Sequence, residues 1–263
     1  MTWFLDTALA AGAVGLVTGA FVPQLIARIP EPDPEPVLEP AADRAQERSV
    51  TSASEHDGEI ASGTEPSVDD PKELYVDIAA SPGLRWRTAV ATAVVAGLVG
   101  ARVGWDPALT LGLYLAPVGV ALAVIDWRTR LLPTKVIAPS YVVVILLAVL
   151  AAVVDGDRQA LVTAALGWLV AGGTFFVLWF VYPRGMGYGD VRLSGLLGIA
   201  LGYLGWPELL TGVYAGFLLG GVGGLLLSLL RLVDRKAYPF GPFMLVGAVV
   251  GVLAGPYVAA WYT

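Results

Sequence analysis

The sequence predicts an all-α integral membrane protein with about eight transmembrane helices. Of its 263 residues, 56% are hydrophobic and only 14% are charged, and the mean hydropathy is positive. Soluble domains are usually about 45–50% apolar and about 25% charged. Lipid must therefore be the solvent for most of this chain.

Eight segments approach the roughly 20 predominantly apolar residues that a transmembrane helix needs, although the sixth is short. In the last two, glycines recur at every fourth position, a pattern that favours close packing between membrane helices. The eight segments are residues 8–27, 88–105, 108–125, 136–154, 160–182, 191–205, 209–230 and 243–262.

The positions of Lys and Arg in the short loops predict the orientation of these spans. With the N-terminus outside, ten basic residues of these loops face the cytoplasm, and only Arg102 and Arg158 face the other side. The reverse orientation would invert this ratio. We therefore expect the N-terminus to lie outside.

Residues 31–85 form an acidic segment that is rich in Pro, Glu, Asp, Ser and Ala and poor in aromatic residues. From Arg28 to Leu84, fourteen acidic and four basic residues give a net charge of −10. Such a segment cannot bury enough apolar surface to offset its chain entropy. We expect a disordered cytoplasmic loop, as a solvated linker or as a partner-binding segment, between a first transmembrane helix in residues 1–30 and a multi-span domain in residues 86–263.

Two residue types that often carry catalysis are scarce. The chain has no cysteine, which excludes disulfides and thiolate metal sites. Its single histidine, His56, lies between Glu55 and Asp57 in the acidic segment. A Ser-His-Asp triad is therefore not expected.

Two aspartates are the candidate functional residues, because charge at membrane depth is costly and usually functional. Asp126 directly follows an apolar run, and Asp190 ends a glycine-rich segment that begins at Gly185. Both fall on the cytoplasmic side of the predicted topology. The acidic residues of the external turns lie beside Pro or Gly and are expected to be solvated. They are Asp106, Asp155, Asp157 and Glu208.

Two carboxyl groups close together in a partly dry site do not ionise independently. They can hold a water molecule between them, one acting as base and the other as acid, as in aspartic proteolysis. The plainer alternative is that each Asp caps a helix or anchors a span end.

The residues around both aspartates resemble the type IV prepilin peptidase family, membrane aspartic proteases of the Gly-x-Gly-Asp kind. The resemblance covers residues 8–30 and about 86–263. It rests on Gly187-Tyr188-Gly189-Asp190, on the basic stretch from Asp126 to Pro133, on Pro239-Phe240-Gly241-Pro242-Phe243, and on the first span with its exit from Gly19 to Pro30. Arg192 stands where the family more usually has Lys.

The resemblance implies that Asp126 and Asp190 form the catalytic pair of a prepilin leader peptidase in the bacterial cytoplasmic (inner) membrane. The substrate would be a type IV pilin-like or pseudopilin precursor with a short basic leader and a long apolar helix. Membrane lipid is the other expected partner, and no nucleic acid is expected. The residues expected to shape the site are Gly187, Gly189, Pro239, Phe240, Gly241 and Pro242.

Bifunctional members of that family carry paired Cys-x-x-Cys motifs after the first span, associated with zinc and with N-methylation. The present chain has none, so we expect an aspartic endopeptidase without methyltransferase activity, metal or other cofactor. Two alternatives remain open: a proton-coupled membrane carrier that uses the same aspartates, and a catalytically silent scaffold of the same fold.

Overall fold

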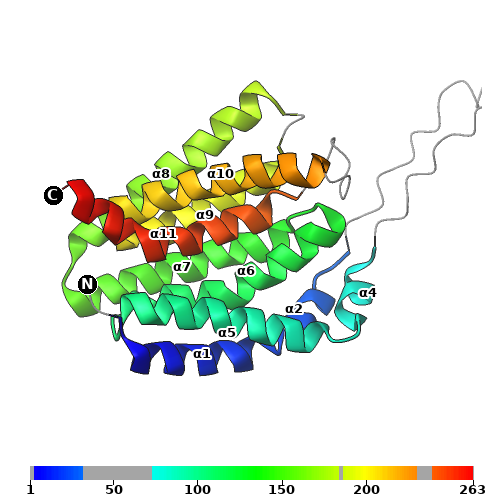
Figure 1. Cartoon of the computed structure of the whole chain (residues 1–263), viewed down its shortest axis with the longest axis horizontal. Helices are drawn as coiled ribbons and strands as arrows, with labels where there is room; N and C mark the ends of the chain where they lie inside the picture. The colour runs from blue at the N-terminus through cyan, green and yellow to red at the C-terminus, as the bar shows by residue number, and fades with distance from the viewer. Residues whose placement is uncertain (1–2, 32–72, 184–185, 230–238, 263) are drawn as a thin grey trace, which may run out of the picture. The chain divides into compact units, whose positions relative to one another are not determined.

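The computed structural model describes residues 3–31, 73–183, 186–229 and 239–262. Within these ranges the chain is helical and contains no strand (Figure 1), which confirms the predicted all-α class. Gly185 and residues 32–72 of the predicted acidic loop lie outside the described ranges.

The described residues form short helices near the predicted loop and long helices elsewhere. They are α1 (Leu5–Gly19), α2 (Val22–Ala27), α4 (Tyr75–Ala80), α5 (Leu84–Val103), α6 (Leu109–Thr129), α7 (Thr134–Asp155), α8 (Arg158–Val181), α9 (Tyr188–Leu204), α10 (Trp206–Leu229) and α11 (Gly241–Tyr262).

Six segments of the described chain are long and apolar enough to cross a membrane: α1 together with α2, then α5, α6, α7, α8 and α11. This number is near the predicted eight. The helix α9 has only 17 residues, at the short end of the range for a span. The chain is thus a multi-pass membrane protein by its helices, and the orientation of its N-terminus remains a prediction.

Successive long helices reverse direction at short connections. Gly104 and Gly156 end α5 and α7 with φ angles of 76° and 69°, which glycine adopts without the steric cost that a Cβ brings. The end of α6 and the starts of α9 and α11 therefore collect at one end of the bundle. Both termini lie at the other end (Figure 1).

The helix α9 is the central element of the bundle. It packs against α7, α8, α10 and α11, and 12 of its 17 residues are buried. A helix enclosed by other helices need not match the thickness of the bilayer, which accounts for its short length. Asp190 is carried by this most enclosed helix.

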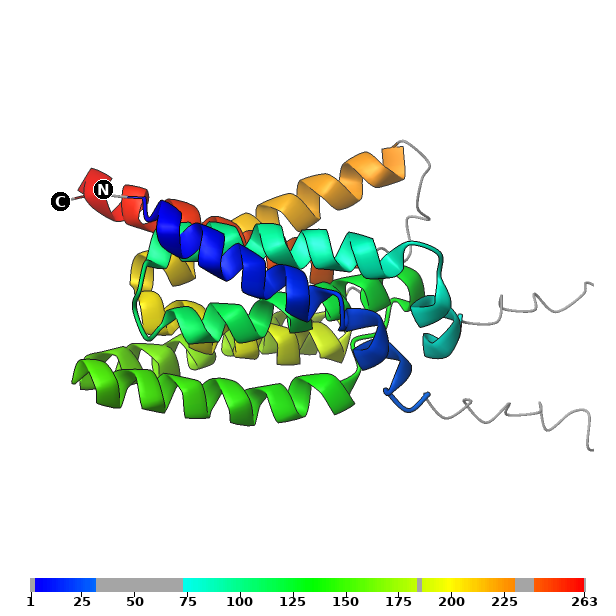
Figure 2. The same ribbon diagram turned by 90° about the horizontal axis from the view of Figure 1, so that it is seen from below.

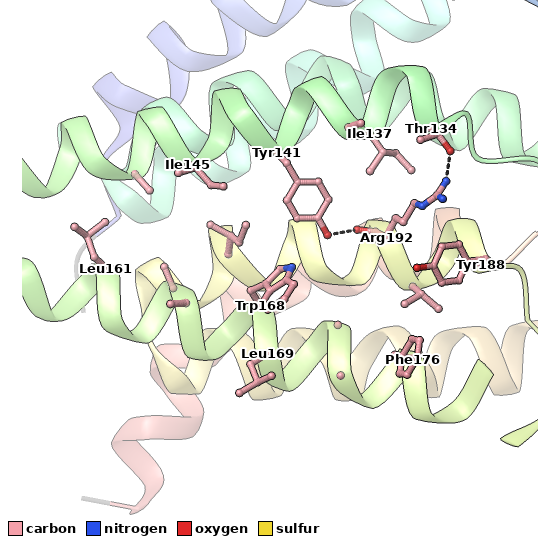
Figure 3. Close-up of a pocket in the computed structure, with 18 of the residues that line it drawn as sticks. Thr134, Ile137, Tyr141, Ile145, Leu161, Trp168, Leu169, Phe176, Tyr188 and Arg192 are labelled. Carbon is pink, nitrogen blue, oxygen red and sulfur yellow. Dashed lines mark hydrogen bonds between the residues drawn. The ribbon is translucent and has the colours of Figure 1, made fainter. Parts of the chain in front are cut away.

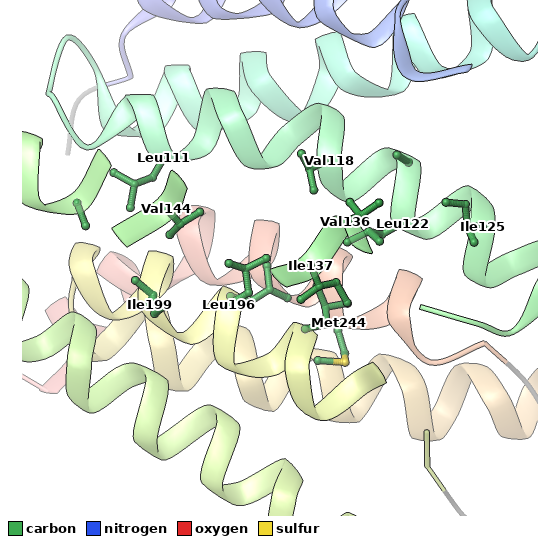
Figure 4. Packing of buried hydrophobic residues seen from close by; sticks show 14 of the residues in the cluster. Leu111, Val118, Leu122, Ile125, Val136, Ile137, Val144, Leu196, Ile199 and Met244 are labelled. Atoms are coloured by element: carbon green, nitrogen blue, oxygen red, sulfur yellow. The ribbon is translucent and has the colours of Figure 1, made fainter. Parts of the chain in front are cut away.

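Apolar side chains fill the space between α9 and its neighbours. Leu122 and Ile125 of α6, Ile137 of α7, Leu196 of α9 and Met244 of α11 belong to one buried cluster (Figure 4). In lipid, such packing stabilises the bundle through van der Waals contact rather than through removal of apolar surface from water. Because Ile125 directly precedes Asp126, this packing fixes the backbone from which the first aspartate projects.

Glycines allow the helix backbones to approach closely. A Cβ atom at Gly247 of α11 would collide with the backbone of Gly216 in α10, and one at Gly251 would lie 2.5 Å from the carbonyl oxygen of Glu208. The predicted packing role of the two glycine series is thus seen between α10 and α11. Similar close approaches join α1 to α5, which lie against each other (Figure 2). There the Thr88 hydroxyl donates to the Gly19 carbonyl at 2.9 Å.

One part of the predicted disordered loop is folded. Residues Tyr75–Ala80 form α4, which packs against α2 and α6, and Tyr75 and Ile78 are buried. The expectation of disorder was wrong for this stretch, because the average composition of residues 31–85 concealed two apolar residues three positions apart. Such a pair lies on one face of a helix.

Candidate active site

Asp126 lies in the last turn of α6. The sequence suggested that the span ends at Ile125, but the helix continues to Thr129, which places the carboxyl within the packed bundle at 4% exposure. Its Oδ2 atom accepts a hydrogen bond from the backbone N–H of Gly241 at 2.9 Å. Gly241 is the first residue of α11, so the carboxylate also faces the positive end of that helix dipole.

Asp190 is the third residue of α9 and is 7% exposed. Its Oδ2 atom accepts from the backbone N–H of Gly187 at 3.2 Å, and its own N–H donates to the Gly187 carbonyl at 3.1 Å. The reciprocal pair of bonds closes the first turn of α9 in the manner of a capping box. Each candidate aspartate therefore accepts a backbone N–H at the start of a helix.

The two aspartates lie at the same end of the bundle, and one apolar residue packs near both of them. This residue is Leu132, in the connection between α6 and α7. It packs near Gly241, which donates to Asp126, and near Gly189, which directly precedes Asp190. A Cβ atom at Gly241 would be 3.5 Å from Leu132 Cδ1, and one at Gly189 would be 2.7 Å from Leu132 Cβ.

Two of the predicted site-shaping glycines leave no room for a side chain. At Gly241 a Cβ atom would lie 2.8 Å from Oδ2 of Asp126, and at Gly189 it would press on Leu132. Gly187 differs, because a Cβ atom there would be 3.5 Å from Asp190 Oδ2, an ordinary contact. Gly187 serves the site through its N–H group, whereas Gly189 and Gly241 permit close approach.

The other predicted site-shaping residues have packing contacts. The ring of Phe240 lies 5.9 Å from that of Phe175 in α8 and 6.0 Å from that of Phe217 in α10. Pro239 is buried, and Pro242 lines a cavity of about 230 Å³ between α5, α6, α9 and α11. These contacts hold the start of α11, and with it the N–H group that faces Asp126.

Several contacts near the pair carried no recognisable sequence signal. Leu132 is an apolar residue in a basic connection. Nothing in the sequence around it indicates that this connection meets the starts of α9 and α11 there. Glu73 forms an ion pair with Arg128 at 3.0 Å, which ties the residues before α4 to the last turn of α6. The side chain of Arg192 donates to the Thr134 hydroxyl and lies 4.6 Å from the centre of the Tyr188 ring.

The arrangement offers two buried carboxyl groups, each oriented by a backbone donor. Among the described residues, no group of three or more His, Cys, Asp or Glu side chains is arranged to hold a metal ion. In general, two carboxyls that share one site can act on the same water molecule, one as a base and the other as an acid.

Comparison with known proteins identifies relatives of this chain. The family described as the type IV leader peptidase family matches residues 113–229, a range that includes both aspartates. The chain is 33% identical over 162 residues to the prepilin leader peptidase/N-methyltransferase of Aeromonas salmonicida, an alignment that covers 60% of this chain and 53% of the relative.

The Escherichia coli protein with the same description is 30% identical over 164 residues, which cover 60% of this chain and 70% of the relative. For the Pseudomonas aeruginosa protein the identity is 27% over 175 residues, with coverage of 66% and 59%. The chain spans about half the length of several curated relatives that it matches. No solved structure matches it.

Proposed function

The chain belongs to the type IV leader peptidase family, and on that premise we propose that it is a prepilin leader peptidase whose water is activated by Asp126 and Asp190. The observation that carries this proposal is the burial of both carboxyls at one end of the bundle, each oriented by a backbone N–H group. The family match supports it, since the matched residues include both aspartates.

The proposed reaction is hydrolysis of one peptide bond by general acid–base catalysis. One carboxylate takes a proton from the water, whose oxygen attacks the carbonyl carbon of the scissile bond. The other carboxyl supplies the proton that the leaving nitrogen needs, and the C–N bond breaks to give an acid and an amine. Gly241 and Gly187 position the two carboxylates through their N–H groups.

The substrate that we propose is the precursor of a type IV pilin-like or pseudopilin subunit. The names of the relatives support the prepilin class. The predicted orientation puts Asp126 and Asp190 at the cytoplasmic face of the bacterial inner membrane, where a cytoplasmic leader is accessible. A reporter enzyme fused after Thr263 and active only outside the cytoplasm should be active, because this topology places the C-terminus outside.

The direct test follows leader removal from a co-expressed pilin-like precursor. Asp126→Asn and Asp190→Asn should each slow processing by roughly 10²- to 10⁴-fold, the usual contribution of a general acid or base. The matched control is Asp157→Asn, at the opposite end of the bundle. Asn caps helices as well as Asp does, so this variant should process normally.

Full processing by stably inserted Asp126→Asn or Asp190→Asn protein would refute the mechanism. The mass of the processed product gives a second reading of the same experiment. Because the chain lacks cysteine, we propose cleavage without methyl transfer, and the new N-terminus should be unmethylated. A methylated terminus that depends on this chain would overturn that part of the proposal.

A proton-coupled carrier finds less support. Beyond Asp190, the polar side chains along α9 are Arg192, Ser194 and Tyr203, and the Ser194 hydroxyl donates to the carbonyl oxygen of Val191 at 2.7 Å. A relay along this helix has too few exchangeable groups. Proton flux into proteoliposomes that depends on Asp190 would favour the carrier.

A further inference from the structure

A cavity of about 440 Å³ lies at the end of the bundle opposite Asp126 and Asp190. It is lined from the ends of α5, α7 and α9, from the starts of α8 and α10, and from the second half of α11. Small-molecule sites in proteins usually measure about 300–1,000 Å³. The cavity is therefore large enough for a small ligand, and the predicted topology places it on the side away from the cytoplasm.

The four acidic residues that the sequence assigns to separate external turns all line this one cavity. They are Asp106, Asp155, Asp157 and Glu208. Among the described residues that line it, Arg102 is the only basic one, so four carboxylates and one guanidinium give a formal net charge of −3. Like charges gathered in one place repel one another unless a cation compensates them. The cavity therefore favours a cationic ligand.

Two of these carboxylates have acceptor oxygens left for a ligand. Asp106 accepts the N–H of Ala108 with its Oδ1 atom at 2.8 Å, which leaves its Oδ2 atom. Asp155, the last residue of α7, is exposed and accepts no hydrogen bond from the residues that the structure describes. Asp157 differs, because it caps α8.

Tyr203 of α9 provides the observation that points to a ligand. Its side chain lines the same cavity and is only 7% exposed, and its hydroxyl has no hydrogen-bond partner within the described part of the chain. Buried hydroxyls nearly always have a partner, because leaving one unpaired costs free energy. Phenylalanine would fill the same space without that cost. Solvated turn residues alone therefore do not account for a tyrosine at this position.

Close packing fixes the wall that the start of α10 contributes. A Cβ atom at Gly255 of α11 would lie 2.7 Å from Cα of Glu208, and one at Gly205, whose φ angle is 145°, would lie 2.8 Å from Oε2 of Glu208. The backbone of α10 thus packs directly on α11, and the Glu208 carboxylate lies over Gly205. The Arg102 guanidinium lies 6.0 Å from the centre of the Tyr257 ring. The charged lining is therefore positioned without a ligand.

The chemistry of the lining favours an ammonium ion over a metal ion. A divalent metal takes several oxygen ligands directly, and among the described residues no three acidic side chains are arranged to hold one. An ammonium group instead donates separate hydrogen bonds, which carboxylate and phenol oxygens accept, and the face of an aromatic ring attracts it. Asp155 and Tyr203 supply these groups.

We propose that this cavity binds a small organic cation with several ammonium groups, a polyamine, which the carboxylates of Asp106 and Asp155 attract and the Tyr203 hydroxyl accepts as a hydrogen-bond donor. The inference does not rest on the proposed peptidase function, because the cavity lies at the other end of the bundle from Asp126 and Asp190. It assigns a ligand to residues that the sequence analysis treats as solvated turns.

Titration calorimetry with spermidine tests the site on the purified full-length protein, in a neutral detergent at low ionic strength. The wild type should bind spermidine in a saturable manner. Tyr203→Phe and Asp155→Asn should each weaken binding by roughly tenfold or more, the loss expected for one hydrogen bond to a charged group. The matched control is Asp77→Asn in α4, which removes the same charge from an exposed position outside the cavity and should bind like the wild type.

Thermal unfolding distinguishes a ligand-binding hydroxyl from a structural one. A ligand that binds only the folded protein raises the Tm, so spermidine should raise the Tm of the wild type and raise that of Tyr203→Phe much less. Without spermidine, Tyr203→Phe should be at least as stable as the wild type, because the hydroxyl that it removes has no partner in the described part of the chain.

Three results would overturn the proposal. The first is the absence of saturable spermidine binding by the wild type. The second is equal spermidine affinity in Tyr203→Phe, or magnesium chloride that binds as tightly as spermidine, since either would show that the carboxylates attract cations by charge alone. The third is a lower Tm of Tyr203→Phe without spermidine, which would give the hydroxyl a structural role. None of these results depends on precursor cleavage, so the proposed peptidase function is tested separately.

Discussion

Both ends of the helix bundle carry aspartates, but these aspartates differ in burial and in the residues that donate hydrogen bonds to them. At one end, Asp106 and Asp157 are exposed and accept hydrogen bonds from nearby backbone, the N–H groups of Ala108 at 2.8 Å and Ala160 at 3.1 Å. At the other end, Asp126 is buried and accepts from Gly241, which lies 115 positions away in the chain.

The difference lies in what each carboxylate organises. A carboxylate that bonds two or three residues ahead stabilises its own turn or helix start, and it keeps its water. A buried carboxylate held by a distant backbone N–H has lost its hydration, which costs free energy unless several groups compensate for it. Asp190 shares the burial of Asp126 although its own hydrogen bond is local. Burial beside a second carboxyl, rather than the range of the hydrogen bond, is what distinguishes the candidate pair.

Among the variants that test the contrast between the two ends, the largest loss of cleavage rate is expected at Gly241. Gly241→Ala would introduce a Cβ atom 2.8 Å from Oδ2 of Asp126, so either the carboxylate or the start of α11 must move. A displacement of about 1 Å in a catalytic group can lower the rate on the order of 10²-fold. The cleavage rate of purified protein measures this loss, and a rate within a factor of two of wild type would show that the position of Asp126 is not critical.

A smaller effect is expected at the glycines before Asp190. Gly189→Ala would press on Leu132 and should lower cleavage by roughly tenfold, since overpacking of a fitted contact typically costs 1–3 kcal/mol. Gly187→Ala makes an ordinary contact and retains its N–H, so it should cleave almost normally. Parallel rate measurements on the two variants test the assignment, and equal losses would contradict it.

The smallest effect is expected at the opposite end. Asp157→Ala removes the side chain that caps α8 and should destabilise the protein by about 1 kcal/mol without changing the cleavage rate per folded molecule. Thermal unfolding in detergent, read together with activity, separates the two quantities. If Asp157→Ala abolished cleavage in folded protein, the contrast between the two ends would be wrong.

The sequence was sufficient for the helical class and the approximate span count, and it singled out Asp126 and Asp190 as candidates. These features depend on local composition and on the rarity of charge near lipid. It was insufficient for Leu132 and for the contact between Gly241 and Asp126, because both join segments far apart in the chain. Averaging over the acidic segment likewise concealed Tyr75 and Ile78, whose burial depends on the neighbouring helices α2 and α6.

The cavity of about 910 Å³ that α7, α8 and α9 line (Figure 3) also could not be predicted from the sequence. Gly172 and Gly173 are adjacent and equivalent in composition, yet one packs against α9 and the other faces open space. Only the positions of α7 and α9 around α8 distinguish them.

The most direct measurement of the central claim compares three purified variants on one precursor: Asp126→Asn, Asp190→Asn and the double variant. Groups that act as one unit have strongly non-additive effects. If both carboxyls activate the same water, each single variant should lose at least about 10²-fold in cleavage rate, and the double variant should be no slower than the slower single one. Cleavage near the wild-type rate by either single variant, or losses that multiply in the double variant, would contradict a shared site.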